Sequence, residues 1–367
     1  MPIIILYFLL NNLSFTQIGI LAAVMSIIHM ATEVHGGIFA DIHGKKTSLI
    51  LHSVFGTLTM LFYFIGDSFA WFLLASVMYG IAGAFITGTR NALLYDTLTK
   101  LNRASEFKKF NGKVLLYSHV VNALVLLAIP VIYTINAKLP FLIGIGFFII
   151  SLILTFFFIE PPLTKKSKTT LAMYNIRFLE ALKEIRLSKK LLSAILLAML
   201  TASFVFMSSE FIQPLLKISG LQVIYFGVIY ALIRGIIGFG GSIAYRLEKY
   251  FTLEKLLFIG VVGIIVSFLG FSFGTGILII LAVLLLNLSE GFNRIILEDE
   301  LNKNIKSENR TTILSILSFS QALFNAGLVF VFGITADLVG VQSMFNYALG
   351  LFIVTIVAAL IFMKNNK

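Results

Sequence analysis

Six ionisable side chains lie within long apolar stretches of this sequence, where charge is otherwise rare. A charge at the centre of a lipid bilayer costs roughly 2.5–3.5 kcal/mol, so an ionisable group kept there is a candidate for binding a solute or carrying a proton. The chemistry open to such groups is ion pairing, solute recognition and reversible protonation. The six are Glu33, Arg90, Glu210, Arg234, Glu290 and Arg294.

Glu210 has no partner of opposite charge nearby in the sequence. It lies seven residues before Lys217, and Pro214 follows it. A carboxylate without a partner in a low-dielectric environment can be protonated reversibly, which proton coupling requires. We therefore predict that Glu210 is a proton or cation site.

Two other sets of charges have neighbours within reach. Glu290 and Arg294 are spaced i, i+4, so they share a helix face and can neutralise each other as a structural ion pair, or face a transport path together. Arg90 lies six residues, about 9 Å of helix, before Asp96. We expect Arg90 to pair with Glu33 or Asp96 in an inner gate, or else to extend its guanidinium to the membrane surface.

The composition places these residues in a membrane protein. Of the 367 residues 59% are hydrophobic and 12% charged, and the mean hydropathy is +0.99, whereas soluble proteins have about half apolar and a quarter charged residues. Cysteine is absent, which excludes disulfides, cysteine-bound zinc and thiol nucleophiles. The histidines form no metal-ligand spacing, and there is no nucleotide-binding loop. We expect no cofactor, no enzymatic activity and no direct use of ATP.

Apolar runs bounded by charged or turn-forming residues predict about twelve membrane-spanning helices, the first of half length. Lys and Arg gather in alternate connections, and the opposite connections contain only Lys138 and Lys217. By the positive-inside rule, the C-terminus is cytoplasmic. The net charge of +11 therefore indicates orientation in a membrane, expected to be a prokaryotic plasma membrane, and no nucleic-acid partner. The predicted spans are 2–11, 17–40, 47–66, 70–92, 114–134, 139–159, 191–216, 221–245, 256–274, 276–297, 312–336 and 341–363.

The longest connection divides the chain into two halves of six spans each. We predict an N-terminal bundle over 1–160, a cytoplasmic linker over 161–190 and a C-terminal bundle over 191–367, together acting as a monomer. Within the linker, apolar residues recur every three positions among charged ones, as in an amphipathic helix on the inner leaflet. The alternative is a solvated linker with some helical propensity.

The two halves resemble each other at an offset of 204 to 205 residues. The segment 36–40 matches 240–244, and Arg90 matches Arg294. This offset predicts a duplicated bundle. It also implies that the first helix lacks about 14 residues present in its counterpart, so that Met1 lies in mid-membrane, through either a misassigned start or a truncated chain.

A short motif between the second and third predicted spans carries a family resemblance. It reads Gly37-Ile38-Phe39-Ala40-Asp41-Ile42-His43-Gly44-Lys45-Lys46. Together with the six-plus-six division and the repeat, it resembles the loop signature of the major facilitator superfamily. Gly37 would let its span approach a neighbour closely, Gly44 permits a reversal with positive φ, and Asp41 can sit at a helix N-terminus. Lys45 and Lys46 supply cytoplasmic charge.

The resemblance implies an all-α membrane fold of two pseudo-symmetric six-helix bundles, with about eleven and a half of the twelve helices present. Proteins of this family move small molecules by alternating access. Their spans 1, 4, 7 and 10 line a central cavity. By this likeness, four of the embedded charges would face the transport path: Arg90, Glu210, Glu290 and Arg294.

In the same family the loop signature is a latch that steadies the outward-open state, with a carboxylate at the inner end of span 4 as its partner. Asp96 stands at that place here. Two positions depart from the signature, because Ile42 replaces a basic residue and Tyr245 stands where the second half would have the Asp. The alternative is that the two lysines of the loop only set the topology.

We therefore predict a secondary transporter of a small molecule, powered by an ion gradient or by the solute's own gradient, with proton-coupled efflux as one form. The segment 122–133 lacks the Gly-Pro-rich signature of drug antiporters, so efflux has no motif in its support. One alternative is a non-transporting or degenerate membrane sensor. Another is a membrane-embedded lipid enzyme, which would need clustered catalytic residues, whereas the ionisable residues here are scattered.

Overall fold

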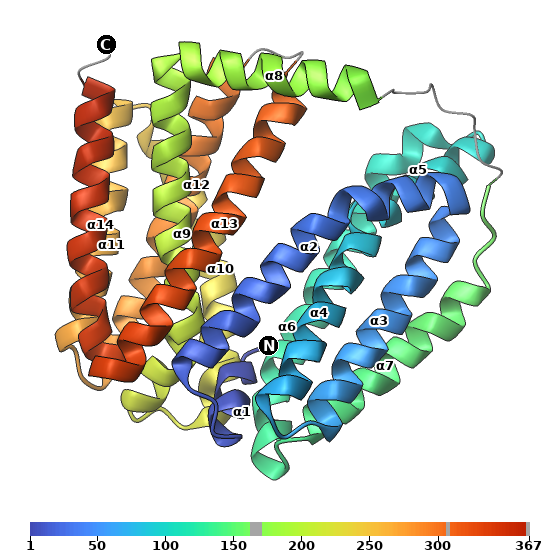
Figure 1. Ribbon diagram of the computed structural model, residues 1–367, viewed down its shortest axis with the longest axis horizontal. Helices are drawn as coiled ribbons and strands as arrows, with labels where there is room; N and C mark the ends of the chain where they lie inside the picture. Colours follow the sequence, from blue (N-terminus) through green and yellow to red (C-terminus); the bar gives the residue numbers. More distant parts are fainter. Residues whose placement is uncertain (162–170, 306–308, 365–367) are drawn as a thin grey trace. The chain divides into compact units, whose positions relative to one another are not determined.

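The computed structural model describes residues 1–161, 171–305 and 309–364, which are mostly helical (Figure 1). The linker residues 162–170, and the basic residues predicted to be cytoplasmic at 306 and 367, lie outside the described residues. The helices are α1 (Ile4–Leu10), α2 (Phe15–His43), α3 (Lys45–Ile65), α4 (Phe69–Ile86), α5 (Thr89–Lys100), η1 (Ala104–Glu106), α6 (Phe107–Ile135), α7 (Leu139–Phe156), α8 (Leu171–Leu187), α9 (Lys189–Ile218), η2 (Val223–Tyr225), α10 (Phe226–Leu247), α11 (Leu253–Phe273), α12 (Ile277–Asn304), α13 (Arg310–Val339) and α14 (Val341–Lys364).

The predicted all-α membrane architecture is confirmed. Within the described ranges, eleven helical segments are long and apolar enough to cross a membrane. The short helix α1, with seven residues, falls where the half-length first span was predicted. The described chain forms two compact units, unit 1 (Met1–Lys166 with Val223–Gly227) and unit 2 (Ser167–Gln222 with Val228–Lys367).

Aromatic side chains anchor α1 in the core of unit 1. The Tyr7 ring lies 4.5 Å from the Phe141 ring of α7, centroid to centroid, and the Tyr7 hydroxyl donates to the Tyr63 carbonyl of α3 at 2.7 Å. Phe72 of α4 is fully buried in the same cluster. Because the Tyr7 hydroxyl has an acceptor, burying this ring leaves no lost hydrogen bond.

Unit 2 has a core of phenylalanines and carries α8 across one end. The Phe204 ring of α9 lies 5.1 Å from the Phe352 ring of α14. The helix α8 crosses the ends of α9 and α13 (Figure 1), and its Ala181 is buried against them. Leu179 and Leu182 on the same helix are exposed. The predicted helix in this segment is therefore present, and it packs on unit 2 through Ala181.

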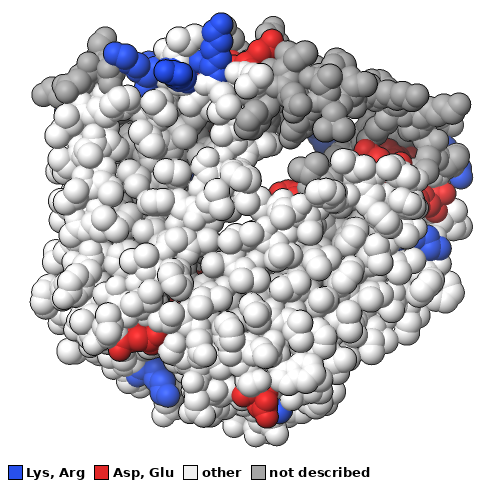
Figure 2. All heavy atoms as spheres, viewed as in Figure 1, with Lys and Arg blue, Asp and Glu red and all other residues white. Residues whose placement is uncertain are grey.

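The surface of unit 2 separates charge from apolar side chains. Lys and Arg side chains gather at the end that carries α8, and a broad uncharged face covers α14 below it (Figure 2). On α11, the apolar residues Phe258, Val262 and Val266 are also exposed. A wide apolar face of this kind is typical of contact with lipid, as expected for an integral membrane protein.

The predicted span 70–92 is not one continuous helix. The helix α4 ends at Ile86, and α5 begins at Thr89. Between them Gly88 has a φ of +73°, a conformation that other residues rarely adopt. Arg90 therefore lies in an exposed position at the start of α5, beyond the break, within the candidate membrane-spanning segment Phe69–Lys100.

Close helix contacts show the predicted repeat in three dimensions. A Cβ on Gly36 of α2 would lie 2.6 Å from the Ala84 carbonyl oxygen of α4, and a Cβ on Gly240 of α10 would clash in the same way with the Leu288 carbonyl of α12. The two pairs are related by the offset of 204 residues. Gly37, the glycine predicted to make the close contact, has nothing within 4 Å of its Cβ position. The contact belongs to Gly36 because successive helical residues point about 100° apart.

We expect Gly36→Ala to lower the free energy of unfolding by about 1–3 kcal/mol, because the added methyl group would push α2 away from α4. Gly37→Ala is the matched control, and it should leave stability unchanged or slightly higher, since alanine favours helix over glycine. Thermal unfolding of the purified protein in detergent measures both variants. Equal melting temperatures for the two variants would contradict the assignment of the close α2–α4 contact to Gly36.

Candidate functional site

The end of the predicted loop motif lies in a group of residues that we call the loop cluster. It consists of Gly44, Lys45 and Lys46 of the motif together with Asp96 and Glu160. Gly44 joins α2 to α3 with a φ of +100°, so the predicted positive φ is confirmed. The Lys45 ammonium makes an ion pair with the Asp96 carboxylate of α5, and the Lys45 side chain is only 10% exposed. The pair fastens the start of α3 to α5.

Glu160, which follows α7, holds the first turn of α3. Its carboxylate accepts hydrogen bonds from the backbone N–H groups of Lys45 and Lys46, the latter at 3.1 Å. In return, the Lys46 ammonium donates to the Phe156 carbonyl at the end of α7, at 2.6 Å. A carboxylate at a helix N-terminus and a cation at a C-terminus both complement the helix dipole. The loop cluster thus ties α3 to α5 and α7 within unit 1.

The other residues predicted in this half are placed differently from expectation. Asp41 lies in the last turn of α2 and not at a helix N-terminus. The carboxylate at the N-terminus of α3 is that of Glu160. Glu33 and Arg90 are exposed. Within the described residues no ion pair joins Arg90 to Glu33 or to Asp96, so the predicted pairing of Arg90 is wrong.

A polar pocket of about 300 Å³ lies in unit 2 among α9, α11, α12 and α13, and we call it the α12 pocket. Glu290 and Arg294 share its wall, as their i, i+4 spacing predicts. The Arg294 Nε, however, donates to Glu298 at 2.8 Å, one turn further along α12, so Glu290 is not its hydrogen-bond partner. The polar residues that line the pocket are Thr201, Glu290, Asn293, Arg294, Glu298 and Gln321.

Ionisable groups of α9, α10 and α12 act on one another electrostatically. Glu290 interacts electrostatically with Arg294 and with Arg234 of α10. Arg234 and Glu210 in turn both interact with Tyr230 of α10. Glu210 itself is not among the residues that line the α12 pocket. Arg234 thus acts electrostatically on Glu290 and, together with Glu210, on Tyr230.

Asn293 is the residue of the α12 pocket that sequence reasoning missed. It is 2% exposed, and neither its Oδ1 nor its Nδ2 has a hydrogen-bond partner in the described part of the chain. Gly260 of α11 leaves the room for this amide, since a Cβ there would clash with it. A buried amide without a partner costs about 1–3 kcal/mol, which a polar group that enters the pocket would recover. The sequence feature that could have identified Asn293 is an amide side chain within a predicted span, directly before Arg294.

Comparisons with known proteins point to one family. A model of the Major Facilitator Superfamily matches residues 1–326. The uncharacterized MFS-type transporter YxaM of Bacillus subtilis (strain 168) is 27% identical over 361 residues, which cover 94% of this chain and 86% of the relative.

Solved structures show the same fold. The nucleoside transporter NupG has a TM-score of 0.79 at 16% identity, covering 97% of this chain and 92% of that chain. A D-xylose-proton symporter has a TM-score of 0.67 at 15% identity, covering 96% of this chain and 89% of that chain. With the family model matched over most of its length, the chain belongs to the major facilitator superfamily of membrane transporters.

Proposed function

We propose that this chain is a secondary transporter that moves a small polar solute by alternating access, with the α12 pocket on the solute's path. The observation that carries the proposal is the buried amide of Asn293, which lacks a hydrogen-bond partner among the described residues and lines the pocket with Glu290 and Arg294. A pocket with a few convergent polar groups is typical of a binding site for a small molecule. We place the monomeric protein in the plasma membrane with its C-terminus in the cytoplasm, on the basic connections described above.

Reconstitution of the full chain in proteoliposomes tests this proposal. Labelled solutes are offered as a panel that begins with nucleosides and pentoses, because two structural neighbours are named as transporters of such solutes. We expect saturable uptake of at least one solute above that of empty liposomes. A chain that binds a solute but moves none would favour the non-transporting sensor.

For the coupling step, we propose proton-coupled efflux with Glu210 as the proton site. Glu210 is half-buried in α9, within a candidate membrane span. In Glu210→Gln, proton-driven accumulation should fall about tenfold or more while solute exchange without a gradient continues, because the amide cannot carry the proton. Glu180→Gln, on the exposed face of α8, is the control. Unchanged proton-driven accumulation in Glu210→Gln would contradict the assignment of Glu210 as the proton site.

We propose that the loop motif, with Gly37 and Asp41, acts with the loop cluster as a conformational latch. Asp41→Asn should lower transport about tenfold without changing the amount of protein in the membrane, because only the conformational equilibrium is affected. Asp67→Asn, an exposed carboxylate between α3 and α4, is the matched control. Uptake rates and membrane abundance are measured together. Unchanged transport in Asp41→Asn would contradict the latch and favour the alternative that Lys45 and Lys46 only set the membrane topology.

A further inference from the structure

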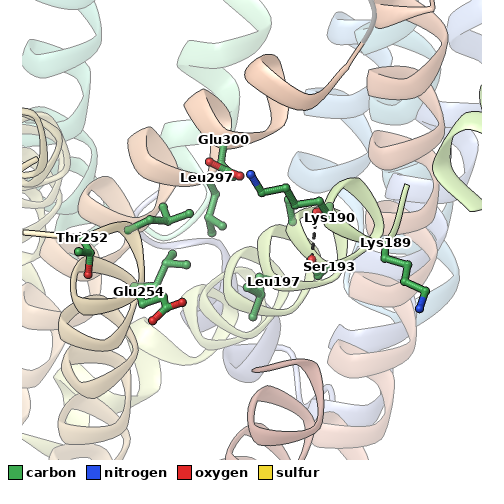
Figure 3. Close-up of a pocket in the computed structure, with 11 residues that line it drawn as sticks. Lys189, Lys190, Ser193, Leu197, Thr252, Glu254, Leu297 and Glu300 are labelled. Atoms are coloured by element: carbon green, nitrogen blue, oxygen red, sulfur yellow. Dashed lines mark hydrogen bonds between the residues drawn. The ribbon is translucent and has the colours of Figure 1, made fainter. Parts of the chain in front are cut away.

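A second and larger cavity lies in unit 2, at the end where α9 and α11 begin. Its volume is about 690 Å³, and α9, α11 and α12 form its walls (Figure 3). It shares Leu297 with the α12 pocket, but it contains neither Glu290 nor Asn293. Both α9 and α11 are candidate membrane spans that start at this level. The cavity therefore lies at the depth of lipid headgroups and not at the middle of a bilayer.

Residues of opposite charge line this cavity together with apolar side chains. The Lys190 side chain extends toward Glu300 (Figure 3), yet no ion pair joins the two in the described residues. The Glu300 carboxylate is held by the Asn304 amide, which donates to it at 2.8 Å. Leu197 and Leu257, which also line the cavity, are buried. A cavity lined by both charges can receive a group that carries both an anion and a cation.

An apolar hollow lies next to the cavity on the outer side of α11. Its volume is about 370 Å³, and Glu254 lines both spaces. Its wall is formed largely by Phe251, Phe258 and Ile259, and Phe258 is 66% exposed. Beyond the hollow, exposed apolar side chains continue along α11. This surface fits a hydrocarbon chain that leaves the cavity and runs down the helix.

We propose that this cavity binds a phospholipid whose headgroup carries both a phosphate and a primary ammonium group, as in phosphatidylethanolamine. The phosphate lies at Lys190 and the ammonium group at Glu300, each forming a charge-assisted hydrogen bond. One acyl chain leaves through the hollow beside Phe258. The lipid site is separate from the proposed solute path, so the lipid-binding proposal does not depend on the transport proposal.

Lipid binding to the purified full chain in detergent tests the site, with native mass spectrometry as the readout. The probes are phosphatidylethanolamine, phosphatidylglycerol, which has the phosphate but no ammonium group, and glycerophosphoethanolamine, which has the headgroup but no acyl chains. We expect phosphatidylethanolamine to bind about tenfold more tightly than either of the others. Lys190→Gln and Glu300→Gln should each weaken its binding about tenfold, and Glu300→Gln should also abolish the preference over phosphatidylglycerol.

Two exposed charges serve as controls, Lys249→Gln beyond α10 and Glu180→Gln on α8, and their affinity for phosphatidylethanolamine should match the wild type. Melting temperatures are measured for all four variants. We expect Lys190→Gln and the two controls to stay at the wild-type value because these side chains are exposed, and Glu300→Gln to stay near it because glutamine keeps an oxygen that can accept from Asn304. Equal affinity for phosphatidylglycerol would overturn the proposal and indicate a simple anion site. Equal affinity for glycerophosphoethanolamine would indicate a soluble ligand, and it would overturn the proposal too. Wild-type binding in Lys190→Gln and Glu300→Gln would show that the cavity is not the site.

Discussion

Replacing Asn293 with leucine is expected to make the protein more stable and almost inactive. Leucine has nearly the shape of asparagine but no polar atoms, so Asn293→Leu removes a buried amide that lacks a partner in the described structure. The free energy of unfolding should rise by about 1–3 kcal/mol. Transport should fall about 100-fold, because the solute loses its hydrogen bonds in the α12 pocket. Melting temperature in detergent and initial uptake rate in proteoliposomes measure the two effects.

Asn287→Leu is the matched control for this experiment. Asn287 lies on the same helix and is 5% exposed, but its amide already donates to the Val283 carbonyl at 2.8 Å. Its replacement should leave transport within about twofold of the wild type. Opposite shifts in stability and activity are typical of a binding residue that is strained for its function. Wild-type uptake in Asn293→Leu, or the same loss in both variants, would show that the α12 pocket does not bind the solute.

The second large effect is expected at Lys45, where Lys45→Glu should destabilise the protein by about 3 kcal/mol and abolish transport. The new carboxylate would face Asp96 and lie beside Glu160, so three negative charges would meet where an ion pair and a helix N-terminus are now satisfied. The Lys45 side chain is 10% exposed, which leaves water little access to screen this repulsion. Membrane abundance, melting temperature and uptake are measured on the same preparations.

A charge exchange distinguishes the loss of the Lys45–Asp96 ion pair from a change in the protein's orientation in the membrane. In the double variant Lys45→Glu with Asp96→Lys, the ion pair between α3 and α5 can form again with its charges reversed, and stability should largely return. Lys100→Glu, at the exposed end of α5, makes the same change of charge without a buried partner, and it should be close to neutral. If Lys100→Glu were as damaging as Lys45→Glu, the effect would come from altered orientation and not from the loop cluster.

Most of the fold could be predicted from the sequence because its main signal is local. A stretch of about 20 apolar residues is enough to identify a span, and the half-length first span followed from the short apolar run at 2–11. The break at Gly88 was missed, because one glycine in an apolar run fits a continuous helix equally well. Similarly, Gly36 and Gly37 are adjacent, and only the position of α4 decides which of them makes the close contact.

The candidate sites could be predicted only in part, because their bonds join distant parts of the chain. Glu160 lies 115 residues from Lys45, and no local pattern links a carboxylate after α7 to the start of α3. On α12, Arg294 has a carboxylate four residues away on either side. The sequence favoured Glu290, because the predicted span ended at 297, whereas the structure bonds Arg294 to Glu298. Asn293 was missed because an amide carries no charge to mark it.

Counterflow tests the central claim most directly. Proteoliposomes that contain the full chain are loaded with unlabelled solute and diluted into labelled solute, with no ion gradient present. An alternating-access carrier exchanges one for the other, so labelled solute should accumulate transiently above its equilibrium level, and Asn293→Leu should abolish this overshoot. A solute that binds to the protein but shows no overshoot in the wild type would contradict the account.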